Sequence, residues 1–112
     1  MKYDNYTKLI NNTFEEHSAT LKETHISLSK NIELTSDIIS NSLKNGGTIF
    51  WCGNGGSAAD SQHLAAELVG RFEKDRKPIK SLSLTTDSSV MTALSNDYSY
   101  DITLSRQLQA LG

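Results

Sequence analysis

The sequence predicts an α/β fold in which a parallel sheet is flanked by helices, and two observations support this prediction. Two short apolar segments, "TIFWC" at 48–52 and "SLSLTT" at 81–86, are each followed by a segment with helical features. Alternation of this kind is typical of parallel sheets with crossover helices. The chain has 112 residues, of which 37% are hydrophobic, and this content fits one small folded domain and excludes a disordered polar segment.

The first 45 residues are predicted to form an N-terminal pair of amphipathic helices. No proline or glycine occurs between Asn5 and Asn45, and apolar residues recur there at spacings of three and four. Gly46 and Gly47 follow, and glycine is favoured where a helix ends in a left-handed C-cap. We therefore expect the helical pair to end there and the first strand, 48–52, to follow.

A further helix is expected after the first strand. Ser57 and Asp60 have the S-x-x-D spacing of a capping box, and Gly70 marks a stop after about Leu68. One side of this helix is apolar and is expected to pack on the sheet. Its residues are Leu64, Ala65, Leu68 and Val69.

The remaining segments continue the alternation. A polar connection, "FEKDRKP" at 72–78, leads to the second strand at 81–86. Asp87 or Ser88 is placed to cap a short helix, and Asp101 is placed to cap a last one. Because two strands bury too little surface to form a stable sheet alone, further strands are expected after this segment.

Composition excludes several classes of function. The net charge is −2 and the basic residues are scattered, so the sequence lacks the basic patch that nucleic acid or an anionic membrane would require. A single cysteine, Cys52, cannot form an internal disulfide and fits a reducing compartment. No apolar run approaches the roughly 20 residues of a membrane span, and the start of the chain lacks the apolar core of a signal peptide. We expect a cytoplasmic protein with a small polar partner.

The glycine-rich turn after the first strand has two interpretations. Gly53, Gly55 and Ala58 match the dinucleotide pattern G-x-G-x-x-A, but Asp87, the candidate acidic residue beyond the second strand, lies too far downstream for that site. No Gly-Lys-Ser/Thr follows the turn, so a Walker loop is excluded. Either the bare backbone and the helix amides bind an oxygen-rich or anionic ligand, or the glycines only permit a tight connection.

His63 and Glu67 are the candidate chemical pair. They are four residues apart, so on a helix they share a face and converge on one ion or substrate, with Asp60 one turn earlier. They would supply two of the four ligands of a zinc ion, and the others would come from elsewhere. The alternative is an exposed helical pair that contributes about 0.2–0.5 kcal/mol. The spacing leaves both interpretations open.

Four segments of the chain match a known family: "CGNGGSAADSQHLAAELVGRF", "SLTTDSS", "TALSNDYSYD" and "SRQLQALG". Together they resemble the phosphoheptose isomerases of the sugar isomerase (SIS) domain superfamily. The resemblance implies a flavodoxin-like SIS fold, with 1–45 as an N-terminal helical segment and 46–112 as the first part of a SIS domain. It also implies a homotetramer with active sites at subunit interfaces. Ser99 departs from the family pattern N-D-Y-G, where glycine is usual.

The resemblance also implies an activity and a set of site residues. Proteins of this family convert sedoheptulose 7-phosphate to D-glycero-D-manno-heptose 7-phosphate, for the heptose of lipopolysaccharide or capsule. By position, zinc falls on His63 and Glu67, and Glu67 is also the catalytic carboxylate. The implied substrate-binding residues are Asn54, Gly55, Gly56, Glu67, Asn96 and Asp97, with Ser57 and Arg71 as weaker candidates.

Two other interpretations remain beside the isomerase. A non-catalytic SIS protein that binds the bacterial replication initiator is similar in the glycine-loop region, but such proteins lack the glutamate that stands here as Glu67. An inactive pseudo-isomerase fragment is the other. The family continues into a phosphate loop and a late helix with a glutamine and a histidine, so this chain is expected to match the N-terminal three-fifths and to be inactive alone.

Overall fold

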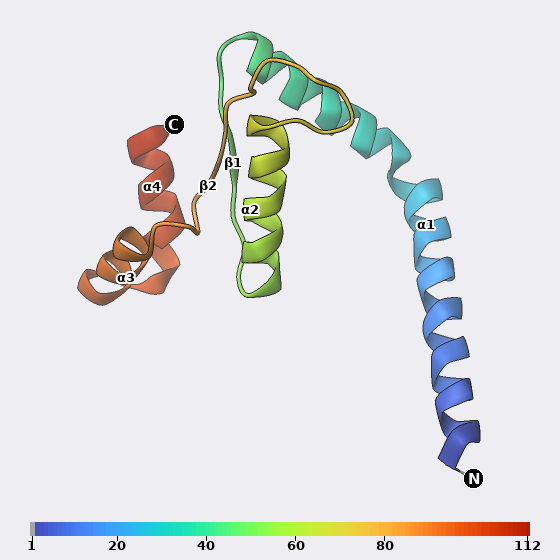
Figure 1. The fold of residues 1–112 in the computed structure, drawn as a ribbon. Coiled ribbons are helices and arrows are strands. Elements are labelled where there is room, and N and C mark those ends of the chain that lie inside the picture. Colours follow the sequence, from blue (N-terminus) through green and yellow to red (C-terminus); the bar gives the residue numbers. More distant parts are fainter. Residues whose placement is uncertain (1) are drawn as a thin grey trace. The chain divides into compact units, whose positions relative to one another are not determined.

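The computed structural model describes residues 2–112, with side chains from Asn5 onward. The chain divides into two compact units, one up to Ile38 and one over Ile39–Gly112, which are described separately. Figure 1 shows the order of the elements along the chain. They are α1 (Lys2–Lys44), β1 (Ile49–Trp51), α2 (Gly56–Val69), β2 (Ser81–Ser83), α3 (Ser88–Asp97), the 3₁₀ turn η1 (Tyr100–Ile102) and α4 (Thr103–Leu111).

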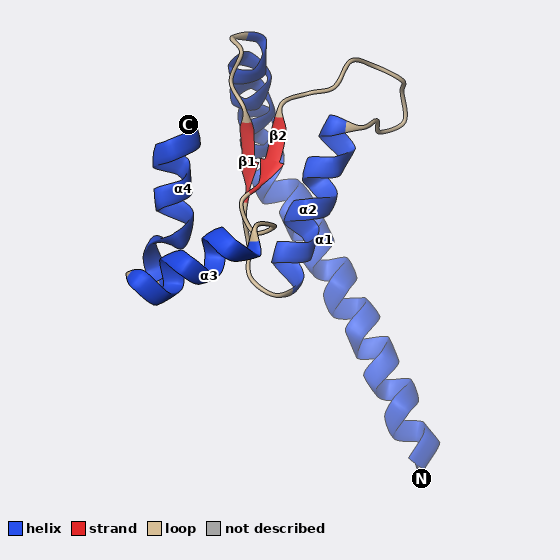
Figure 2. Cartoon of the chain, turned by 60° about the vertical axis from the view of Figure 1, so that its left-hand side comes forward, coloured by secondary structure: helices blue, strands red, loops and turns tan. Residues whose placement is uncertain are grey.

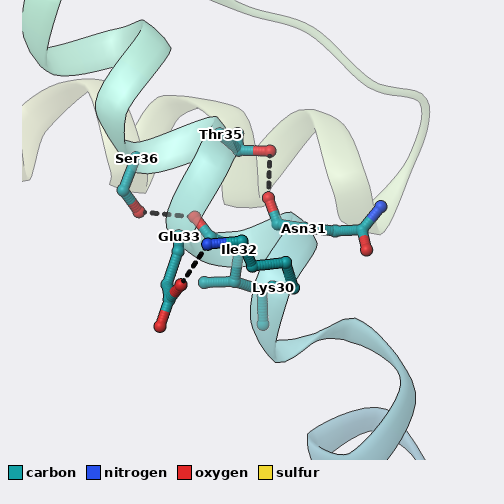
Figure 3. Close-up of polar contacts among 6 residues, drawn as sticks. All are labelled: Lys30, Asn31, Ile32, Glu33, Thr35 and Ser36. Atoms are coloured by element: carbon teal, nitrogen blue, oxygen red, sulfur yellow. Dashed lines mark hydrogen bonds and ion pairs between the residues drawn. The ribbon is translucent and has the colours of Figure 1, made fainter.

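The N-terminal segment is one continuous helix of 43 residues, so the prediction of a helical pair was wrong. No glycine or proline interrupts it, and its hydroxyl side chains bond back to the helix itself instead of ending it. Figure 3 shows two such bonds, from Thr35 to the Asn31 carbonyl at 2.7 Å and from Ser36 to the Ile32 carbonyl at 2.8 Å. The same view shows an exposed ion pair of 3.1 Å between Lys30 and Glu33.

The second unit contains a parallel two-stranded sheet, which confirms the predicted α/β class. Ile49 pairs with Ser81, and Trp51 pairs with Ser83, so both strands are shorter than expected. The connection between the strands runs through α2, which contacts both of them. Figures 1 and 2 show α3 and α4 on the other side of the strands from α2. Because the two strands are parallel, their carboxyl ends lie at the same edge of the sheet.

The contact between α2 and the sheet is partly polar. Ala65 and Ser61 of α2 are buried, as are Ser83 and Leu84 at the end of β2. The Ser61 hydroxyl lies 2.7 Å from that of Ser83 and 3.1 Å from that of Thr85, and the last two are 2.9 Å apart. We call Ser61, Ser83 and Thr85 the hydroxyl cluster. It occupies a position where apolar side chains were expected.

The predicted sheet-facing stripe of α2 was therefore only partly right. Ala65 is buried, but Leu64 remains 41% exposed and Val69 remains 49% exposed. Successive helical residues are separated by about 100° around the axis. With Ser61 and Ala65 directed at β2, Leu64 is turned toward the side of α2 that carries His63 and Glu67.

The helix starts gave a mixed result. The Asp87 carboxylate accepts a bond of 2.9 Å from the Val90 amide, which confirms the predicted cap of α3. The predicted capping box at the start of α2 was wrong, because the N-cap is Gly55 and no side chain caps it. Asp101 does not cap α4 either, since it lies within η1, which precedes that helix.

The division between the compact units falls within α1, after Ile38. This division reflects how densely residues contact one another and does not mark the end of the helix. The predicted boundary between segments 1–45 and 46–112 therefore stays a prediction. Across residues 2–112, none of the helices combines the length and the apolar character that a membrane span would need.

Candidate functional site

The glycine turn lies at the carboxyl end of β1 and leads directly into α2. Gly55 has φ +56° and ψ −117°, a conformation that L side chains rarely adopt. At Gly53 an added Cβ would lie 2.4 Å from the carbonyl carbon of Ser57, so this position also requires glycine. The sequence therefore needs both glycines to turn the chain within a few residues.

Hydrogen bonds within the turn hold it closed. The Asn54 amide donates to the Ser57 hydroxyl at 2.8 Å, and that hydroxyl donates to the Asn54 carbonyl at 2.9 Å. The Ser57 and Ala58 amides donate back to the Asn54 and Gly55 carbonyls. Among the described residues, the amides of Gly55 and Gly56 at this end of α2 have no hydrogen-bond partner. They are the donors that remain for a ligand, and a helix N-terminus favours an anionic or oxygen-rich one.

His63 and Glu67 meet on one face of α2, as their spacing predicted. His63 Nε2 lies 3.3 Å from Glu67 Oε1, and the two side chains are 75% and 31% exposed. The pair borders a groove of about 500 Å³. The rest of the groove is mostly apolar and includes Trp51, Leu64, Leu68 and Phe72. A polar pair at the edge of an apolar groove is a common arrangement in ligand sites.

The pair is compatible with half of a zinc site. Two ligands of a tetrahedral zinc ion, each at about 2.0–2.2 Å, lie about 3.3–3.5 Å apart, and the distance from Nε2 to Oε1 falls at the lower end of that range. Over the described part of the chain, no group of three or more His, Cys, Asp or Glu side chains is placed to hold a metal. His63 and Glu67 therefore fit zinc as two ligands of four.

The glycine turn and the His63–Glu67 pair are separated along α2. At a rise of about 1.5 Å per residue, His63 lies about 10 Å and Glu67 about 16 Å from the first helical residue, Gly56. Side chains on a helix lean toward its N-terminus, which shortens this separation. A ligand that touches both regions would therefore have to be extended.

The other predicted contacts lie at the end of α3 and beyond α2. The Asn96 amide group donates to the Asp97 carboxylate at 3.0 Å, and both side chains are exposed. Arg71 is exposed just after Gly70, and no hydrogen bond joins it to the glycine turn. The structure thus brings Asn96 and Asp97 together, while it places Arg71 at the far end of α2.

Two residues that sequence reasoning missed connect these regions. The Tyr100 hydroxyl donates a hydrogen bond to Asn54 Oδ1, which joins η1 to the glycine turn across 46 positions of sequence. Arg76 donates to carbonyl groups at the end of α2, including that of Glu67 at 2.8 Å. One sequence signal could have indicated the role of Arg76. The last turn of α2 has no basic residue, so a basic side chain from outside the helix is expected at its C-terminal end.

Comparison with known proteins gives a consistent result. The family model described as "SIS domain" matches residues 13–111. The phosphoheptose isomerase of Campylobacter concisus is 48% identical over 103 residues, which are 92% of this chain and 54% of that protein. The phosphoheptose isomerase of Akkermansia muciniphila is 52% identical over 86 residues, which are 77% of this chain and 46% of that protein.

Solved structures agree with the sequence matches. The phosphoheptose isomerase of Neisseria gonorrhoeae superposes with a TM-score of 0.86 at 36% identity, over 96% of this chain and 55% of that one. The enzyme from Francisella tularensis superposes with a TM-score of 0.89 at 33% identity, over 96% and 56%. The chain spans about half the length of the relatives that it matches. Since the family model covers almost all of it, the chain belongs to the SIS domain family.

Proposed function

We propose that the protein carrying this chain is a phosphoheptose isomerase, which converts sedoheptulose 7-phosphate to D-glycero-D-manno-heptose 7-phosphate. The main support is the identity of 44–52% with proteins of that name, together with the His63–Glu67 pair at 3.3 Å on α2. The product would supply the heptose of lipopolysaccharide or capsule, and the protein would act in the cytoplasm.

Glu67 is proposed as the catalytic base. Isomerisation moves the carbonyl from C2 to C1, so a base must remove the proton from C1 and return it to C2, while a hydroxyl proton passes from O1 to O2. The Glu67 carboxylate is partly exposed at the edge of the groove, where a sugar carbon can approach it. His63 beside it orients the carboxylate.

The glycine turn is proposed to bind the sugar hydroxyls. The free amides of Gly55 and Gly56 are donors for sugar oxygens, and the Asn54 side chain adds a polar group held by Tyr100. Asn96 and Asp97 would bind a second set of hydroxyls, with Ser57 and Arg71 as weaker candidates.

Zinc is proposed as the cofactor, held by His63 and Glu67 with the other ligands supplied from outside this chain. The fit rests on the distance between the two ligand atoms. When bound, zinc would polarise the sugar carbonyl and so make the C1 proton more acidic. Glu67 would then serve both as a ligand and as the base, either by alternating between the two roles or by acting as base through a loosened coordination.

A homotetramer is the proposed assembly. In the unit up to Ile38, apolar side chains of α1 remain more than half exposed, and such a surface is unusual on a helix that functions alone. They include Leu9, Ile10, Phe14, Leu21, Ile26 and Ile32. The same helix in other copies of the chain is the proposed partner.

The decisive experiment is sugar turnover by the full-length protein, followed by NMR of the product. Wild type should isomerise sedoheptulose 7-phosphate, and Glu67→Gln should lower kcat at least about 100-fold, because the amide keeps the shape of the carboxylate but not its basicity. Glu73→Gln makes the same change at an exposed position outside the site and should retain activity. An inactive wild type would favour a non-catalytic SIS protein, and an active Glu67→Gln would assign the proton transfer to another group.

A further inference from the structure

Arg76 lies in the connection between α2 and β2, and its guanidinium group reaches back to the C-terminal turn of α2. Nη2 donates to the Glu67 carbonyl at 2.8 Å, and Nη1 donates to the Leu68 carbonyl at 2.8 Å. Nη1 also lies 3.4 Å from the Gly70 carbonyl and 3.1 Å from the Lys77 carbonyl. One side chain thus engages three carbonyls at the end of α2 and the carbonyl of the next residue in the chain.

These bonds satisfy groups that a helix end leaves without partners. The last four carbonyls of a helix have no donor within it, and in α2 these include the carbonyls of Glu67 and Leu68. The helix end also carries a partial negative charge, and α2 has no basic residue in its last turn to balance it. The half-buried Arg76 supplies both the donors and the positive charge. The Ile79 amide adds a bond of 3.0 Å to the Leu68 carbonyl.

The consequence concerns Glu67, because it lies only two residues before the end of α2 at Val69. Terminal turns of helices fray, and a frayed turn would no longer place residue 67 over residue 63. The distance of 3.3 Å between Glu67 and His63 therefore depends on a closed last turn. The Glu67 carbonyl, which one of the Arg76 bonds holds, belongs to the same residue as the carboxylate of the site.

We propose that Arg76 is a positioning residue, which keeps the last turn of α2 closed so that the Glu67 carboxylate stays beside His63. This inference rests on the proposed function, because it assigns Arg76 a part in the isomerase site. Arg76 acts through the backbone of Glu67 and touches no substrate. A purely structural role would lower stability without altering turnover by the folded protein, so the two roles are separable.

The test compares Arg76→Lys with Lys77→Ala in the full-length protein. Arg76→Lys keeps the charge but loses the two-pronged geometry that bonds adjacent carbonyls. Lys77→Ala removes a charge from the neighbouring exposed side chain and leaves Arg76 in place. Three quantities are measured well below each melting temperature: amide hydrogen exchange at residues 66–69, kcat, and KM for sedoheptulose 7-phosphate.

In Arg76→Lys, exchange at residues 66–69 should rise at least about tenfold while exchange in β1 stays unchanged. The value of kcat should fall at least about tenfold, with KM within about twofold, because the base is displaced while the sugar-binding turn is intact. Lys77→Ala should match wild type in all three. If Arg76→Lys does not fold, Arg76→Gln, which keeps a planar donor group, is measured in the same way.

Two results would overturn the proposal. Unchanged exchange at residues 66–69 would show that Arg76 does not hold the turn, and faster exchange with wild-type kcat would show that the closed turn is not needed for catalysis. Failure of the proposed function has a different signature, because wild type itself would then lack turnover. In that case the exchange measurement still decides whether Arg76 keeps Glu67 in the helix.

Discussion

Replacing Gly53 with alanine tests the close approach on which the glycine turn depends. The new Cβ would lie 2.4 Å from both the carbonyl carbon and the carbonyl oxygen of Ser57, about 1 Å inside ordinary van der Waals contact. These are backbone atoms in the first turn of α2, so no side-chain rotation relieves the overlap. Either the turn or the start of the helix must shift.

The cost can be worked out from the bonds that such a shift breaks. Three hydrogen bonds join Asn54 and Ser57, at 2.8, 2.9 and 3.1 Å. Each contributes about 1 kcal/mol net, and an overpacked site adds about 1–3 kcal/mol of strain. Because a shift weakens these bonds more than it abolishes them, Gly53→Ala should lower the free energy of unfolding by about 2–4 kcal/mol.

The assay is urea unfolding of the full-length protein, followed by circular dichroism. Gly56→Ala is the matched control, because nothing lies within 4 Å of its added Cβ and alanine is favoured over glycine in a helix. It should change stability by less than about 1 kcal/mol. If Gly53→Ala unfolds at the same urea concentration as Gly56→Ala, the turn relaxes freely, and the steric reasoning fails.

Two further predictions concern the two ends of the candidate site. His63→Ala should remove zinc from the purified full-length protein, as measured by elemental analysis, while circular dichroism shows that α2 remains formed. The control, His17→Ala on α1, should retain the metal. Equal zinc content in both variants would reject His63 as a ligand. Asp87→Ala should lower the free energy of unfolding by about 1 kcal/mol, as measured by thermal unfolding, because the Val90 amide loses its cap. Asp87→Asn keeps an acceptor, so it should lower the free energy of unfolding by only a few tenths of that amount. Equal losses in the two variants would show that the cap contributes little.

The sheet could be predicted from the sequence because its signals are local. Two apolar segments separated by one helix have essentially one way to pair, as parallel neighbours, and the structure has that pairing. The single N-terminal helix was misread as two although no glycine or proline divides it. Ser and Thr are weak helix formers in isolation, but in α1 their hydroxyls bond to carbonyls four residues earlier and the helix continues.

The candidate site was predictable to the extent that it lies on one helix. Spacing alone brings His63 and Glu67 together, and the glycine turn precedes them in sequence. Arg76 and Tyr100 were missed because their bonds depend on how the chain returns after an irregular connection. Glu73 in that connection has φ +53°, which no local pattern predicted. Contacts of this kind are set by tertiary structure and have no fixed spacing.

The hydroxyl cluster has a consequence for the register between helix and strand. Apolar contacts are non-directional, so a helix on a narrow sheet can slide along it at little cost. Hydroxyl groups bond only within about 3 Å and in defined directions. A slide of one helical turn, about 5.4 Å, would leave the buried Ser83 and the half-buried Thr85 without the Ser61 hydroxyl. The three small side chains therefore favour one position of α2 along the strands over positions shifted by a helical turn. Apolar side chains of the same size would not distinguish these positions.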